Sequence, residues 1–69
     1  MKITYFKDTD TLLVSFNDKP IAETKDFSED ILVEFDDKGD LVSMTVEHAS
    51  QKANMSDFSF KQVAEPLNL

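Results

Sequence analysis

Few residues of this chain are able to do acid–base or nucleophilic chemistry. His48 is the only histidine, it follows Glu47, and Ser50 stands two positions further on. A histidine beside a carboxylate can act as a general base, and a serine near it as a nucleophile. Adjacent strand residues point to opposite faces, however, so Glu47 does not orient His48 locally. A minor hydrolase that uses Ser50 and His48 is therefore the third of three hypotheses, and we expect no enzyme.

The densest acidic cluster surrounds a lysine and a glycine and consists of Asp36, Asp37 and Asp40. A calcium loop needs alternating oxygen ligands and a distant glutamate, and this cluster lacks that register. Aspartate side chains bond nearby backbone amides in turns, which explains the cluster and also Asp8 and Asp10. One histidine without cysteine makes no zinc site. We expect no catalytic residue, no metal and no cofactor.

Two alternating segments joined by a tight turn organise the chain, residues 30–36 and 41–48. The period of two is typical of half-buried strands, and its apolar positions are Ile31, Val33 and Phe35, then Val42, Met44 and Val46. Gly39, the only glycine, lies between the segments, where a short hairpin loop requires a positive φ. Gly39 is therefore predicted to be a structural turn residue.

Three further strands are predicted at residues 2–6, 11–16 and 21–25, and residues 26–29 are expected to link the third strand to the central hairpin. The links are short, and short links join antiparallel strands, so we predict an antiparallel meander of about five strands. The main core is predicted to consist of Leu12, Val14, Ile31, Val33, Phe35 and Val46.

The pattern changes after His48, and residues 49–69 are predicted to be a C-terminal helical tail. Residues 49–53 are compatible with a helical turn. Ser59 resembles an N-cap, with Gln62 three positions later as a capping box requires. Pro66 would end this helix. Phe58 and Phe60 also alternate, so a sixth short strand within residues 56–65 remains an alternative. The expected fold is one α+β domain over residues 1–69, with the meander in residues 1–48.

Apolar residues are also expected on the second face of the sheet. They include Leu13, Leu32 and Leu41, with Phe6 beside them. A solvated sheet face would be polar throughout, so either the tail or another chain is expected to cover these leucines. They are our candidate interaction surface.

The charge balance narrows the classes of partner. The chain carries a formal charge of −7, and all seven of its basic residues are lysines. Nucleic-acid binding needs basic side chains on phosphates, so direct binding to nucleic acid is not expected. No apolar run is long enough for a membrane span, and the first residues do not resemble a signal peptide. We therefore expect a cytoplasmic protein that binds no membrane.

The order of several short motifs resembles a known family. They are Ile3-Thr4-Tyr5, Asp8 and Asp10 before Leu12-Leu13-Val14, then Ile21-Ala22-Glu23-Thr24, residues 30–36, Gly39, Leu41-Val42 and Ala49-Ser50. Together they resemble the DUF2283 family of small bacterial proteins over about residues 1–50. Ser43 and Glu47-His48 depart from the family's usual residues. The resemblance implies a small antiparallel sheet with a C-terminal helix, no established activity, and an antitoxin-type role beside small toxin-like proteins.

These observations lead to a first functional hypothesis, a non-enzymatic protein-binding module. Its expected partner is a small basic toxin-like protein that it neutralises as an antitoxin would, and it is expected to form a homodimer. An acidic surface speeds encounter with basic partners. A structural or small-ligand-binding domain is the alternative hypothesis.

Overall fold

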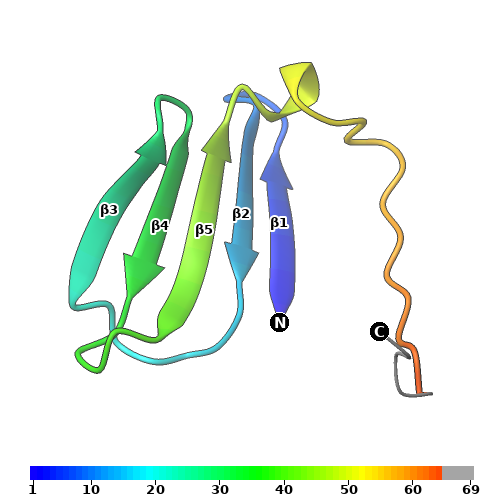
Figure 1. Cartoon of the computed structure of the whole chain (residues 1–69). Coiled ribbons are helices and arrows are strands. Elements are labelled where there is room, and N and C mark those ends of the chain that lie inside the picture. The colour runs from blue at the N-terminus through cyan, green and yellow to red at the C-terminus, as the bar shows by residue number, and fades with distance from the viewer. Residues whose placement is uncertain (65–69) are drawn as a thin grey trace.

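The computed structural model describes residues 1–64, and these form one antiparallel sheet of five strands (Figure 1). The strands are β1 (Lys2–Phe6), β2 (Thr11–Ser15), β3 (Glu23–Ser28), β4 (Ile31–Phe35) and β5 (Leu41–Glu47). A single 3₁₀ turn, η1 (Ala49–Gln51), follows β5. The predicted five-stranded antiparallel sheet is confirmed.

The order of the strands differs from the predicted meander. It is β1-β2-β5-β4-β3, so β5 lies between β2 and β4, and β2 through β5 have the strand order of a Greek key. The seven-residue segment 16–22 crosses the ends of β5 and β4 to reach the far edge (Figure 1). Seven extended residues span up to about 25 Å, and three strand spacings take only about 15 Å. The meander prediction was wrong because a short link does not require neighbouring strands.

Contacts at the lower end of the sheet hold the crossing segment in place. The backbone N–H of Phe16 donates to the carbonyl of Val42 at 2.8 Å, and the Asn17 side-chain amide donates to the carbonyl of Leu41 at 3.0 Å. The Lys19 ammonium lies 3.7 Å from the Asp36 carboxylate. The crossing segment therefore docks on the turn between β4 and β5.

That turn follows the predicted chemistry. Gly39 has a φ of +83°, as expected. The buried carboxylate of Asp36 accepts the backbone N–H groups of Lys38 and Asp40, both at 2.9 Å. The N–H bond from Asp40 is the main reason that the pKa of Asp36 lies below its ordinary value. Asp36 thus has the backbone-capping role in the turn that the sequence indicated for the acidic cluster.

Cross-strand register places the predicted core residues on one face of the sheet. Val14, Met44 and Val33 are aligned across β2, β5 and β4, as are Leu12, Val46 and Ile31. We call this side the apolar face; by register and by the hollows it lines, its apolar residues are Ile3, Tyr5, Leu12, Val14, Phe27, Ile31, Val33, Phe35, Leu41, Met44 and Val46.

The predicted core residues share a face but do not form a buried core. All six are only half-buried. Within residues 1–64 the buried hydrophobic residues are Val42 and Ala49, at 3% and 1% exposure. A sheet buries an apolar face only when a second layer packs on it, and residues 1–64 supply no such layer.

The sheet has two irregularities, and the first explains a residue that the alternating pattern misplaced. Glu34 is opposite Ser43 and Phe35 is opposite Leu41, so Val42 is an extra residue in a β-bulge. Val42 therefore lines a hollow on the other face and does not join Met44 and Val46. The second irregularity lies between Asp26 and Ser28. Phe27, predicted to be in a linker, belongs to β3 and lies on the apolar face, on the same side of the strand as Lys25.

Within residues 49–64 the tail does not form the predicted C-terminal helix, so the predicted α+β fold class is not confirmed. A helical turn is present at Ala49–Gln51, but residues 59–64 are neither helix nor strand, so the sixth-strand alternative is also wrong for residues 56–64. Pro66 lies outside the described residues. A helix of about six residues is unstable unless its apolar face packs against something, and Phe58, Phe60 and Val63 are exposed.

Candidate functional site

Leu13 and Leu32, two residues of the predicted interaction surface, lie on the face opposite the apolar face. Thr45 of β5 separates them, because it is aligned with Leu13 of β2 on one side and with Leu32 of β4 on the other. Both leucines are half-buried. Phe6 falls on the same side by alternation along β1. Leu41, the third predicted residue, lies instead on the apolar face, next to Phe35.

We call the side of Leu13 and Leu32 the leucine face. Its charged residues are mainly acidic, because register and alternation place Asp26, Glu34 and Glu47 on it. Asp26 is aligned with Leu32, and Glu34 lies two residues further along the same strand. The Ser43 hydroxyl donates to the Glu34 carboxylate at 2.8 Å and fixes its direction. The leucine face thus combines apolar anchors with carboxylates.

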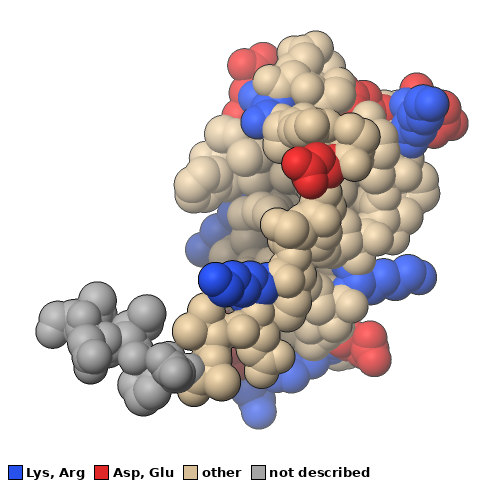
Figure 2. All heavy atoms as spheres, turned by 90° about the vertical axis from the view of Figure 1, so that its right-hand side faces the viewer, with Lys and Arg blue, Asp and Glu red and all other residues tan. Residues whose placement is uncertain are grey.

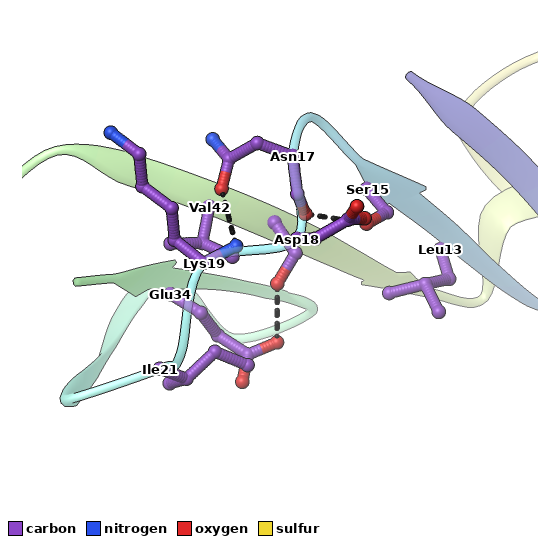
Figure 3. A pocket seen from close by; sticks show the side chains of 9 residues that line it. Leu13, Ser15, Asn17, Asp18, Lys19, Ile21, Glu34 and Val42 are labelled. Atoms are coloured by element: carbon purple, nitrogen blue, oxygen red, sulfur yellow. Dashed lines mark hydrogen bonds between the residues drawn. The ribbon is translucent and has the colours of Figure 1, made fainter.

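A hollow of about 420 Å³ opens on the leucine face beside Leu13 (Figure 3). The sheet provides one wall and the crossing segment the other. The lining side chains are Leu13, Ser15, Asn17, Asp18, Lys19, Ile21, Glu34, Val42 and Ser43. The Lys19 ammonium belongs to the rim, where Asp36 and Asp40 lie 3.7 and 4.0 Å from it. The hollow offers two hydroxyl groups and two carboxylates, those of Asp18 and Glu34, beside the apolar side chains.

A second constellation lies at the opposite end of the sheet and centres on Asp10. The Tyr5 hydroxyl donates to the Asp10 carboxylate. The Ser50 hydroxyl and backbone N–H donate to the same carboxylate at 2.7 and 3.0 Å, and the N–H of Ala49 donates to the Asp10 carbonyl at 3.0 Å. The bond from Tyr5, followed by that from Ser50, holds the pKa of Asp10 below its ordinary value, and Asp10 raises the pKa of Tyr5.

His48 binds a different carboxylate. Its Nδ1 lies 3.0 Å from Asp30, and the Lys52 ammonium lies 3.1 Å from the other oxygen of Asp30. The bond to Asp30 raises the pKa of His48, and the same bond is the largest cause of the lowered pKa of Asp30. Both His48 and Asp10 have a left-handed backbone, with φ values of 54° and 56°.

The contacts of Ser50 and His48 fit a structural role. A serine nucleophile needs a base within hydrogen-bond reach, whereas the Ser50 hydroxyl donates to Asp10 and the His48 ring is bonded to Asp30. These bonds dock η1 on the β1–β2 and β3–β4 turns. In residues 1–64 no group of three or more histidine, aspartate or glutamate side chains is arranged to hold a metal ion.

Sequence reasoning assigned Asp10 to a turn and Ser50 to weak nucleophilic chemistry, and it missed their contact. Forty positions separate them, so no local pattern connects them. The only signal was that both stand among the motifs quoted for the family resemblance. Phe27 was missed because the third strand was expected to end at Lys25, whereas β3 continues to Ser28.

On the tail side of the molecule, the residues that the structure describes form no continuous charged patch. Figure 2 shows separate lysine and carboxylate groups on a surface made mostly of uncharged residues. On this side Phe58 and Phe60 border a hollow of about 290 Å³ together with Met1 and Ile3. Within residues 1–64, no helix is long and apolar enough to cross a bilayer.

Comparison with known proteins gives one match. The family model described as protein of unknown function (DUF2283) matches residues 2–50, from the start of β1 to η1. No curated protein and no solved structure matches the chain. The matched region contains both faces of the sheet and the Asp10–Ser50 contact.

Proposed function

The chain belongs to the DUF2283 family, and from this premise we propose that it is a non-enzymatic protein-binding module whose leucine face binds a small basic protein. The partner is of the toxin-like kind, and binding would neutralise it as an antitoxin does. The observation that carries the proposal is the pairing of Leu13 and Leu32 with the carboxylates of Asp26, Glu34 and Glu47 on one face.

The two kinds of residue have separate roles in this binding. Burial of the leucines against a partner supplies affinity, because apolar surface leaves water. The carboxylates attract a basic partner over longer distances and raise the association rate, an effect that salt weakens. Alternation along β1 places Lys2 on the leucine face, and it is the one lysine that the strands contribute to this face. The net charge of −7 acts in the same direction.

The test begins with the tagged full-length chain co-expressed with the products of neighbouring genes. A small basic protein that co-purifies is then titrated against the wild type, Asp26→Lys and Asp37→Lys. Both aspartates are exposed, but Asp37 belongs to the β4–β5 turn. We expect Asp26→Lys to lower the association rate several-fold and Asp37→Lys to change it far less.

A second pair of variants tests the apolar part. Leu13→Asp and Leu32→Asp should weaken binding of the partner strongly, whereas they should lower the melting temperature only slightly. The proposal fails if no basic neighbour binds the purified chain, or if these variants and Asp26→Lys bind it as the wild type does.

The hollow beside Leu13 supports the second candidate function, small-ligand binding. Its volume of about 420 Å³ lies within the range of ligand sites, and the Ser43–Glu34 pair gives it fixed polar groups. Ligand-detected NMR with a fragment library would decide between the two. Saturable binding that Ser43→Val abolishes would favour the ligand, particularly if no basic protein partner is found.

A further inference from the structure

The apolar face lies on the side of the sheet opposite the proposed partner site and leaves a large apolar surface open. Six side chains of β3, β4 and β5 surround an open hollow of about 380 Å³ there: Phe27, Ile31, Val33, Phe35, Leu41 and Met44. None of the six is charged or hydrogen-bonding. Phe27 and Leu41 are exposed, at 76% and 39%. A finished monomer rarely leaves a contiguous apolar face of this kind in water.

We propose that this face binds a second copy of the chain, so that two sheets pack face to face as a β-sandwich. Two sheets that pack in this way form a core from their inner faces. The same surface patch then serves on both subunits, as a two-fold dimer requires. The second subunit supplies the layer that residues 1–64 lack.

The exposed area agrees with a dimer of ordinary size. The chain exposes 5846 Å², whereas a compact monomer of its mass exposes about 4,400 Å². Part of this excess of about 1,500 Å² lies on the extended residues 54–64. A standard interface takes about 800 Å² from each partner, which is roughly half of the excess.

The distribution of charge favours a second copy over a basic protein at this face. The charged strand residues on this side are Glu23 and Lys25 at its outer edge, and their side chains lie 3.8 Å from each other. Lys25 also lies 5.7 Å from the centre of the Phe35 ring. Two such faces meet without bringing like charges together, and a basic partner would find no carboxylate cluster there. The acidic groups of the leucine face point away from this contact.

The tail is the competing cover. Within residues 54–64, Phe58 and Phe60 lie near Met1 and Ile3 at the β1 edge, and neither lines the hollow between β3, β4 and β5. Phe58 is 66% exposed, close to the value of Phe27. The two phenylalanines are therefore a matched pair, one on the proposed interface and one on the tail.

Sedimentation velocity of the full-length chain over a concentration series tests the proposal. We expect the wild type to have twice the mass of one chain, and added salt to strengthen the dimer because both copies are acidic. Phe27→Asp should raise the dissociation constant at least about tenfold, whereas Phe58→Asp should leave it unchanged. Because Phe27 is exposed in the single chain, its replacement should not unfold the sheet.

A second pair of variants, both in β4, controls for loss of the dimer through misfolding. Val33→Asp changes the apolar face, and Leu32→Asp changes the leucine face one residue away. We expect only Val33→Asp to produce monomers, with circular dichroism reporting the fold of both. A wild type that stays monomeric at millimolar concentration, or a dimer that tolerates Phe27→Asp but not Phe58→Asp or Leu32→Asp, would overturn the proposal. Loss of the dimer would leave the partner site on the leucine face untouched.

Discussion

Single residues with unusual backbone angles mark both ends of the sheet. Gly39 has a φ of +83° in the β4–β5 turn, and an added methyl group there would meet nothing within 4 Å. His48 and Asp10 have left-handed angles at the other end without being glycine. Space is thus available at Gly39, so the backbone alone decides what a substitution costs.

We predict that Gly39→Ala lowers the free energy of unfolding by about 1 kcal/mol, because alanine disfavours a left-handed backbone. Urea titration measures the change. Lys38→Ala in the same turn is the control, since Lys38 is exposed and its backbone does not have a positive φ. Equal midpoints for the two variants would contradict the role assigned to Gly39.

The His48–Asp30 pair predicts a pH dependence of stability. Asp30, with smaller effects of Glu47 and Asp10, raises the pKa of His48. A raised pKa in the folded chain means that this stabilisation is complete below about pH 6.5, the ordinary value, and is lost as the pH rises through the folded pKa. We expect the wild type to lose stability between pH 6 and pH 8.

His48→Asn is the control for this loss, because asparagine tolerates a left-handed backbone and does not titrate. Thermal melts at pH 6 and pH 8 should show a smaller difference in melting temperature for the variant than for the wild type. The assignment of His48 to Asp30 is wrong if the two proteins show the same difference.

At the scale of elements, η1 is fastened to the sheet and the segment after it is not. Ala49 is buried, and Ser50 bonds Asp10 in the β1–β2 turn. In residues 54–64 Met55 alone is half-buried, and the others are exposed. The family match also ends at residue 50. Within the described residues 1–64, the folded unit therefore ends close to η1.

We predict that a chain ending at Ala53 melts within a few degrees of the full-length protein, because residues 54–64, the described part of the removed segment, bury little surface. A chain ending at Glu47 should melt at a markedly lower temperature, since it loses Ala49 and the bonds of Ser50 to Asp10. Differential scanning calorimetry compares the three. A large loss on the first truncation would mean that the tail covers part of the sheet.

At the scale of the whole molecule, one layer of sheet leaves the predicted core open to water. Phe35 is half-buried in the single chain, so Phe35→Ala in a monomer should cost less than the roughly 3–5 kcal/mol of a core phenylalanine. In a dimer the same side chain is more deeply buried and the cost rises. The proposed dimer would therefore link stability to association.

We predict that the melting temperature of the wild type rises with protein concentration, because a dimer that dissociates on unfolding is stabilised by mass action. Phe35→Ala should lower the melting temperature and flatten its dependence on concentration. Leu13→Ala on the leucine face should retain the dependence. A melting temperature that is constant for the wild type would indicate a monomeric fold.

The sequence by itself determined the local features. Alternation located all five strands, although β3 lies two to three residues further on than expected, and it grouped Leu12, Val14, Ile31, Val33, Phe35 and Val46 on one face. A single glycine located the β4–β5 turn. These features depend on neighbours within a few residues, where side-chain parity and turn chemistry act.

Only the tertiary structure decided how the strands are ordered and what lies on each face. The position of β5 between β2 and β4 depends on contacts between distant segments, and a seven-residue link permits more than one order. A bulge reversed the parity that placed Val42, and β3 extends through Phe27, beyond the end that the sequence pattern predicted. The contact of Asp10 with Ser50 and the absence of a second layer over residues 1–64 are likewise non-local. Periodicity reports which residues seek burial, whereas the packing partner that buries them is a property of the assembled fold.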